Sequence, residues 1–425
     1  MSTLRLAAAT GFVQTAFSMV LSFVSVKITS VYLGPAGLGA VGQLGYFMAM
    51  SMAVIAAGPN IGLVRRIAEV GEERSQRDRV VSTVLRTLLA IGVPAALAIG
   101  IGSSWFATEL LHDAQLTLCF WLFALVFLFG LIGSVIIACA AGAKDFKSLA
   151  LINMGSGVVG LALMATLSPL FGLAGGLAAT ALTPLVNCAI AWAFARRRDW
   201  WPRRALVHGF SRSEARKAAT FVPMAVISAV ALPLLQILVR DNVATHGGMA
   251  EVGLLQGVMR VSDMYLGVAT SVFTMYYFQR FSEIRSADEL VREATQGFLI
   301  IVPAVAVVSA CIYLLRDVIV RLIFTEAFLP MRDLFGWQMV GNVLKMVGWL
   351  FGYLLLAKAN ALAMAALELT TIGVWWLLSI YFIAAHGTVG ATQAFAATYA
   401  LYSVATLVGV AFVVKRMRKT VALAK

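Results

Sequence analysis

The chain has 425 residues, of which 61% are hydrophobic and only 12% are charged. A water-soluble domain cannot bury this much apolar surface, so the composition excludes a soluble protein and predicts an all-α polytopic membrane protein. The net charge of +13 does not indicate nucleic-acid binding, because most Lys and Arg residues gather in alternate loops and at the termini. We therefore expect no nucleic acid among its partners.

Twelve apolar segments follow one another along the chain, and each is long enough to take part in a helix that crosses a bilayer. They cover residues 5–32, 39–64, 83–111, 116–141, 148–170, 175–195, 217–240, 250–279, 295–323, 332–357, 361–384 and 389–414. The basic loops alternate with the loops 34–39, 112–115, 171–175 and 385–390, which contain no Lys or Arg. The positive-inside rule therefore predicts cytoplasmic N- and C-termini and basic cytoplasmic loops that contact anionic phospholipids.

The first segment carries small polar residues on one helix face and a cation on the opposite side. The stripe consists of Gln14, Ser18, Ser22, Ser25 and Thr29, a pattern typical of close helix packing. Lys27 lies near the outer end of the segment. It either reaches the membrane surface or faces a central cavity, where it would contact an anionic head group.

Short motifs recur at matching places in the two halves of the chain. AGLGAVGQ (36–43) parallels AEVGLLQG (250–257), and FGLAGGLAATAL (171–182) parallels HGTVGATQAFAATYAL (386–401). These echoes predict a tandem duplication of six-helix units related by a pseudo-twofold axis along the membrane normal. We place an N-terminal lobe at residues 1–205 and a C-terminal lobe at residues 206–425.

The segment 250–279 places an amide, a cation and a carboxylate on one helix face. Gln256, Arg260 and Asp263 follow one another at steps of four and three residues. Arg260 and Asp263 can form an ion pair, which reduces the cost of burying both charges. Such a pair is either a structural contact or part of a substrate-binding site.

The stretch from Arg332 to Lys358 is the strongest candidate for a functional site. It is apolar enough to cross a bilayer, yet Gln338, Asn342 and Lys345 place polar groups on one helix face. Lys345 lies about 20 Å along the helix axis from Arg332, and an ion at this depth is costly unless it faces a polar cavity or a partner. The sequence therefore predicts a site for a charged substrate inside the membrane.

Further ionisable residues accompany this stretch. A hydrated ion-pair network at the periplasmic rim is predicted from Arg240, Arg316, Asp317, Arg332 and Asp333. Glu368 lies roughly 15 Å into its apolar segment, where it either pairs with a cation or takes up and releases a proton. The cysteines and histidines have no metal-ligand spacing, so we expect no metal site, no cofactor and no catalytic residues.

The segment LLRDVIVRLIFTEAFLPMRDLFGWQMVGNVLKMVGWLFGYLLLAKA (314–359) resembles the Wzx-type flippases of lipid-linked oligosaccharides. It is most similar to the branch that moves lipid III, the lipid-linked repeat unit of enterobacterial common antigen. The motifs LGPAGLG (33–39), EVGLLQGV (251–258), SDMYL (262–266) and AHGTVGATQAFAATY (385–399) extend the resemblance over both halves. This family belongs to the multidrug/oligosaccharidyl-lipid/polysaccharide exporter superfamily. The resemblance implies two six-helix lobes around a cationic cavity in the bacterial inner membrane, alternating between inward- and outward-open states.

The resemblance also implies functional residues at the positions that match the family's motifs. These are Lys27, Arg240, Asp263, Arg316, Asp317, Arg332, Asp333, Lys345, Lys358 and Glu368. In two respects the chain departs from the family pattern. Asn342 stands where members of the family carry Asp, which puts a proton role at that position in doubt. Arg260 and Arg321 replace neutral residues and add positive charge.

Together these features predict a flippase, not an enzyme, for an undecaprenyl diphosphate that carries a lipid III or O-antigen unit. The diphosphate would contact Lys27, Arg260 and Lys345. Gln256, Gln338 and Asn342 would add polar contacts, and Asp263 and Glu368 would couple transport to protons or to the membrane potential. The polymerase and chain-length proteins of the same pathway are the expected protein partners. The alternatives are a multidrug antiporter of the same superfamily, which would favour an acidic cavity, and a polyprenyl-linked glycan-processing enzyme, which would need a sizeable outer loop or domain.

Overall fold

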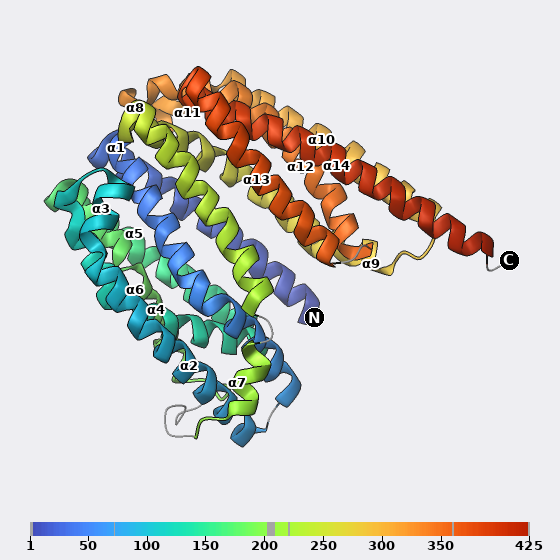
Figure 1. Cartoon of the computed structure of the whole chain (residues 1–425), viewed down its shortest axis with the longest axis horizontal. Coiled ribbons are helices and arrows are strands. Elements are labelled where there is room, and N and C mark those ends of the chain that lie inside the picture. Colours follow the sequence, from blue (N-terminus) through green and yellow to red (C-terminus); the bar gives the residue numbers. More distant parts are fainter. Residues whose placement is uncertain (1–2, 72, 202–208, 220–221, 359–360, 424–425) are drawn as a thin grey trace. The chain divides into compact units, whose positions relative to one another are not determined.

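The computed structural model of the protein describes residues 3–71, 73–201, 209–219, 222–358 and 361–423. In these residues the chain forms helices joined by short connections, without a strand (Figure 1). They fold into two compact units, the first comprising Met1–Leu33 and Ala40–Ile237 and the second comprising Gly34–Gly39 and Leu238–Lys425. The predicted all-α class is confirmed. The predicted boundary between residues 205 and 206 lies outside the described residues and stays a prediction.

The first unit is organised around one central apolar helix. It contains α1 (Thr3–Val70, apart from residues 34–39), α2 (Arg74–Ile101), α3 (Ser103–Leu111), the 3₁₀ turn η1 (Ala114–Leu116), α4 (Thr117–Gly142), α5 (Phe146–Ala181), α6 (Thr183–Ala195), α7 (Arg212–Ala219) and the first part of α8, up to Ile237. α4 packs against α2, α5 and α6 and fully buries Phe120, Phe123 and Phe127. Because α4 is apolar on all sides, it forms the core of this unit.

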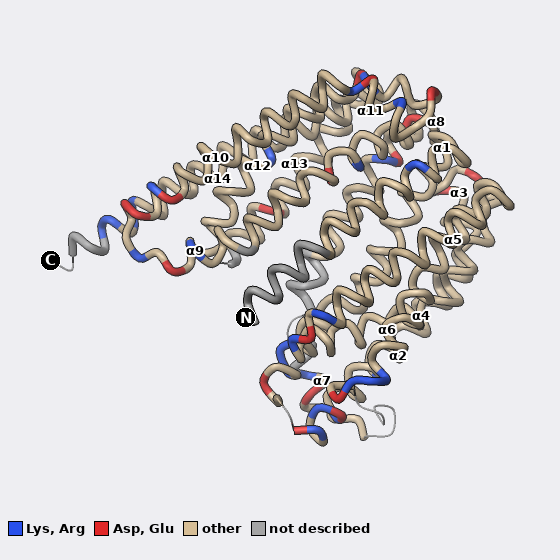
Figure 2. The backbone as a smooth tube through the Cα atoms, turned by 180° about the vertical axis from the view of Figure 1, so that it is seen from behind, with Lys and Arg blue, Asp and Glu red and all other residues tan. Residues whose placement is uncertain are grey.

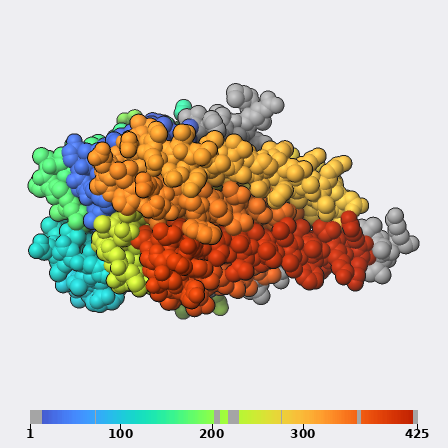
Figure 3. Space-filling view, turned by 90° about the horizontal axis from the view of Figure 1, so that it is seen from above, coloured from blue at the N-terminus to red at the C-terminus, as the bar shows by residue number. Residues whose placement is uncertain are grey.

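The second unit begins within α8 (Val222–Val272), which continues into the π-helical turn η2 (Phe273–Tyr277). It then contains α9 (Phe278–Glu283), α10 (Ala287–Leu314), α11 (Arg316–Ile323), the 3₁₀ segment η3 (Glu326–Leu334), α12 (Phe335–Lys358), α13 (Ala361–His386) and α14 (Thr388–Leu423). α12 contacts α9, α10, α13 and α14. On one face of the unit α10 and α14 lie side by side (Figure 3). The central place of α12 positions its polar residues inside the unit.

Glycines with a positive φ divide the long helices. Gly34 (φ 65°) interrupts α1, Gly172 (φ 57°) interrupts α5 and Gly248 (φ 82°) interrupts α8, while Gly387 (φ 58°) separates α13 from α14. Only glycine adopts such angles without strain. Gly248 lies 214 residues after Gly34, and Gly387 lies 215 residues after Gly172. The kinks therefore recur with nearly the same spacing in the two halves, which supports the predicted duplication.

The helices of the described chain have the length and composition of membrane spans. Eight continuous helices are long and apolar enough to cross a membrane. The described α-helices other than α7 correspond in order to the twelve predicted segments if α1, α5 and α8 are divided at Gly34, Gly172 and Gly248. In this comparison α2 and α3 count as one segment, as do α10 and α11, the second part of α5 and α6, and the second part of α8 with η2 and α9. Charged residues gather mainly toward the helix ends of each unit, and long helical stretches between them carry few charges (Figure 2). The protein is an all-α polytopic membrane protein.

Candidate functional site in the second unit

Asn342 of α12 is fully buried at the centre of a hydrogen-bond network. Its Nδ2 donates to Ser262 Oγ (2.8 Å) and to Tyr265 Oη (2.9 Å), both on α8. Its Oδ1 accepts from Gln338 Nε2 (3.2 Å). Tyr265 Oη lies 2.8 Å from Ser309 Oγ of α10. The network joins α8, α10 and α12, so the polar face predicted on α12 points into the interior of the second unit.

Lys345 lies one turn further along α12, and its ammonium faces aromatic rings. Nζ is 4.6 Å from the ring centre of Trp349, 5.6 Å from that of Tyr399 and 5.9 Å from that of Phe395. The charge of Asp263 on α8 attracts this ammonium, but within the described chain Nζ has no salt bridge and no hydrogen bond. Cation–π contacts are worth about 0.5–2 kcal/mol. They leave the N–H groups of Lys345 without an oxygen acceptor among the described residues. Lys345 therefore retains its capacity to bind an anion.

Arg260 and Asp263 are both exposed on α8, one turn apart. In the described part of the chain no ion pair joins them, although the sequence suggested one. Exposed side chains gain little from pairing and lose rotamer freedom when they do, which accounts for the difference. Arg260 is therefore a second cation of this unit with no carboxylate partner among the described residues.

Glu368 of α13 is exposed and lines a cavity of about 250 Å³ together with Trp349, Tyr353 and Tyr402. Among the described residues no cation forms a salt bridge with it, so the predicted alternative of pairing with a cation is not found. The indole of Trp349 borders this cavity and also contacts the Lys345 ammonium. The carboxylate and the half-buried Lys345 are thus linked through one aromatic side chain.

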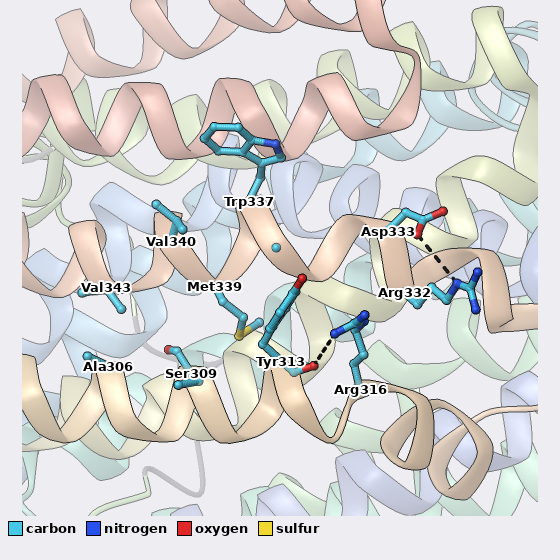
Figure 4. A pocket seen from close by; sticks show the side chains of 12 residues that line it. Ala306, Ser309, Tyr313, Arg316, Arg332, Asp333, Trp337, Met339, Val340 and Val343 are labelled. Carbon is cyan, nitrogen blue, oxygen red and sulfur yellow. Dashed lines mark hydrogen bonds and ion pairs between the residues drawn. The ribbon is translucent and has the colours of Figure 1, made fainter.

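A further cavity, of about 610 Å³, lies between α10, α11, η3 and α12 (Figure 4). One end is polar: Arg332 Nε lies 3.7 Å from Asp333 Oδ1, and the Arg316 guanidinium lies 4.3 Å from the ring centre of Tyr313. The other end is apolar and is lined by Ala306, Trp337, Val340 and Val343. The cavity wall includes Ser309, whose hydroxyl belongs to the Asn342 network. Its chemistry suits an amphiphile with an anionic end.

Arg240 does not line this cavity. It is fully buried in α8, where its Nε and Nη2 donate to Gln256 Oε1 at 3.1 and 2.6 Å. Gly248 lies between the two residues, so the contact holds the two arms of the kinked helix together. Gln256, which was predicted to bind substrate, is therefore hydrogen-bonded to Arg240, which was predicted to lie at the rim.

The remaining predicted residues are not brought into these contacts. Lys27 is half-buried in the first unit, so its predicted role beside Arg260 and Lys345 stays a prediction. Asp317 is exposed on α11 and forms no salt bridge with a described residue. Arg316 instead donates to the backbone oxygen of Tyr313 at 2.9 Å.

Sequence reasoning missed a group of residues at the glycine kinks. His246, Glu251, Asp333 and His386 line a cavity of about 380 Å³, and Thr388 Oγ1 donates to the Glu251 carboxylate. His246 and Glu251 flank Gly248, and His386 precedes Gly387. Their position in or beside the predicted connections 241–249 and 385–390 was the available signal in the sequence. No group of described His, Cys, Asp or Glu residues in the chain is arranged to hold a metal ion.

Known proteins are similar to this chain in sequence and in fold. A family described as "Polysaccharide biosynthesis protein" matches residues 31–333. The proteins named Lipid III flippase of Escherichia coli (strain K12) and of Shigella flexneri are each 30% identical to it over 376 residues, which is 88% of this chain and 90% of theirs. A solved inward-facing structure of a multidrug resistance MATE family transporter of the MOP superfamily has a TM-score of 0.76 at 17% identity, covering 95% of this chain and 96% of that one. The chain belongs to the polysaccharide biosynthesis protein family.

Proposed function

We propose that this protein is a flippase that moves an undecaprenyl-diphosphate-linked oligosaccharide from the cytoplasmic to the periplasmic leaflet by alternating access. The cargo is a lipid III or O-antigen unit, in keeping with the names of the relatives from Escherichia coli and Shigella flexneri. The observation that carries the proposal is Lys345, an ammonium inside a membrane-spanning unit whose described close contacts are aromatic faces. An anion that leaves water for hydrocarbon costs several kcal/mol unless a cation accompanies it.

In this mechanism the diphosphate binds Lys345 and Arg260 of the second unit and Lys27 of the first. Charge-assisted hydrogen bonds to phosphoryl oxygens are stronger than neutral ones, and the Arg260 guanidinium can engage two oxygens at once. Gln338 Oε1 is buried without a hydrogen-bond partner among the described residues, so it is available to a hydroxyl of the glycan. The polyprenyl tail stays in lipid, and no covalent bond is made or broken.

The 610 Å³ cavity of Figure 4 supports an amphiphilic cargo, because it offers guanidinium groups at one end and apolar side chains at the other. Glu368 and Asp263 are exposed carboxylates of the same unit, and we assign them the uptake and release of protons that drive the cycle. With both termini in the cytoplasm, basic loops rest on anionic phospholipid. The polymerase and chain-length proteins of the pathway then act on the delivered glycan.

Translocation of a defined lipid-linked glycan in proteoliposomes tests the proposal. Lys345→Met removes the charge and keeps an unbranched side chain that is one atom shorter. We expect translocation to fall about tenfold or more, as loss of one charge-assisted contact predicts. Lys415→Met, at an exposed lysine near the end of α14, is the matched control and should transport like the parent. Parental rates for Lys345→Met would remove the cation from the mechanism. Transport of a cationic dye without transport of the glycan would instead identify a multidrug antiporter.

A further inference from the structure

The first unit contains a cavity of about 640 Å³, and half of the residues that line it are charged. It lies where the end of α1, the start of α2, the end of α4 and the segment after α6 come together. The charged residues that line it are Arg74, Arg77, Lys144, Asp145, Arg198 and Asp199. Figure 2 shows the end of the first unit that contains α7 as a concentration of charge. None of the residues assigned to transport lines this cavity.

Two of the four cations in this cavity are balanced by its carboxylates. Arg198 Nε lies 3.5 Å from Asp145 Oδ2, and Arg74 Nη2 lies 3.8 Å from Asp199 Oδ1. The other two cations form no salt bridge with a described residue. The cavity therefore keeps two positive charges that the surrounding described side chains leave uncompensated.

The first of these uncompensated cations, Arg77, is buried. Its side chain is 8% exposed, and Nη2 donates to the backbone oxygen of Asp199 at 2.8 Å. Its Nε–H is buried without an acceptor among the described residues. An unsatisfied donor on a buried charged group is unfavourable, so the arrangement favours a bound group that supplies an acceptor oxygen.

The second uncompensated cation, Lys144, lies at the exposed turn that follows α4, in a left-handed backbone conformation (φ 57°). Trp200 borders the same cavity and is itself held by a 2.9 Å hydrogen bond from Nε1 to Asp145 Oδ2. Trp200 and Trp201 are both buried at this end of the unit. Tryptophan is typical of the level of the lipid head groups, where phosphate is concentrated.

We propose that this cavity binds a phosphate group, either that of an anionic phospholipid head group or inorganic phosphate. Two uncompensated cations match the charge of a phosphomonoester or of the two phosphodiesters of cardiolipin. Guanidinium and ammonium donors form charge-assisted hydrogen bonds with phosphoryl oxygens. The site does not depend on the function proposed above, and its test measures binding and not transport.

The test uses the purified full-length protein, titrated with cardiolipin, phosphatidylcholine or inorganic phosphate while bound lipid and the unfolding midpoint are measured. Lys144→Asn removes one charge, and asparagine tolerates the left-handed backbone at this turn. Lys147→Asn is the matched control, because Lys147 is exposed three residues away and does not line the cavity. Arg77→Lys keeps the buried charge but loses the Nε–H donor.

We expect Lys144→Asn to bind the anion about tenfold more weakly than the parent. Arg77→Lys should also bind it more weakly, while Lys147→Asn should match the parent. Dependence on Lys144 with cardiolipin alone would identify a lipid head group as the ligand. The same dependence with inorganic phosphate would identify free phosphate. Equal binding of both anions by Lys144→Asn and Lys147→Asn would overturn the proposal.

Discussion

Gly39 and Gly253 pack backbone to backbone: a Cβ atom on Gly39 would lie 2.9 Å from Gly253 N. A Cβ atom on Gly253 would lie 1.7 Å from Pro35 O. Gly253 lies 214 residues after Gly39, the same spacing that separates the kinks at Gly34 and Gly248. Equivalent positions of the two repeats therefore contact each other, and the contact leaves no room for a side chain.

The first prediction follows from this contact. Gly253→Ala places a methyl group against backbone atoms that cannot rotate away. We therefore expect the free energy of unfolding to fall by about 1–3 kcal/mol, as for other overpacked sites. The thermal unfolding midpoint in detergent measures it. Gly45→Ala is the control, because a Cβ atom at Gly45 of α1 would meet nothing within 4 Å. Equal midpoints for the two variants would show that the backbone contact is not constrained.

The second prediction concerns the buried network around Asn342. Asn342→Leu removes the donor to Ser262 and Tyr265 and the acceptor of Gln338. We expect destabilisation of about 1–3 kcal/mol, because buried polar groups are left unsatisfied. Chemical denaturation followed by circular dichroism gives the difference.

The control for Asn342 is a polar residue that bonds only within its own helix. Ser271 Oγ donates to Gly267 O at 2.9 Å, so Ser271→Ala should leave the stability nearly unchanged. If Asn342→Leu were as stable as Ser271→Ala, the network would not hold α8, α10 and α12 together.

The third prediction concerns Glu368, which lines the 250 Å³ cavity beside Trp349. Glu368→Gln cannot exchange a proton, so we expect translocation in proteoliposomes to lose its acceleration by an imposed pH gradient. Glu109→Gln, at an exposed carboxylate of α3, should keep that acceleration. A Glu368→Gln protein that still responds fully to the gradient would exclude this carboxylate from coupling.

The fourth prediction concerns Asp145, outside the membrane spans. Burial alone would raise its pKa, but hydrogen bonds from Trp200 and Ser148 and the charge of Arg198 together hold the pKa of Asp145 below its ordinary value of 3.8. The ionised form therefore stabilises the folded state above pH 3.8, and this contribution is lost as the pH falls through the folded-state value.

Asp145→Asn tests this linkage. The variant should unfold at a lower temperature than the parent at neutral pH, and the difference should shrink as the solution is acidified below pH 3.8. Unfolding midpoints across this range measure it. A difference that stays constant down to strongly acidic solution would mean that the carboxylate charge makes no contribution.

The sequence was sufficient to predict the features that depend on local pattern. Apolar segments predicted the helices, and matching glycine motifs predicted the repeat that the kinks at Gly34 and Gly248 support. The polar face of α12 was also predictable, because Gln338 and Asn342 are one helical turn apart and indeed share a hydrogen bond.

Contacts between distant segments were not predictable in the same way. Arg240 and Gln256 were assigned to different sites, yet they bond to each other, because the non-helical backbone at Gly248 redirects the chain between them. Helical spacing does not apply across such a kink. The aromatic rings around Lys345 come in part from α14, and no pattern within α12 indicates them.

Residues 34–39 belong to the second unit, although the chain on both sides of them belongs to the first. A polypeptide that began at Leu238 would therefore lack residues 34–39, including Pro35, against which the main chain of Gly253 packs. The second unit therefore cannot be cut out of the chain as one continuous fragment. Cutting the chain between Ile237 and Leu238 would leave residues 34–39 on the first fragment and the backbone of Gly253, against which they pack, on the second.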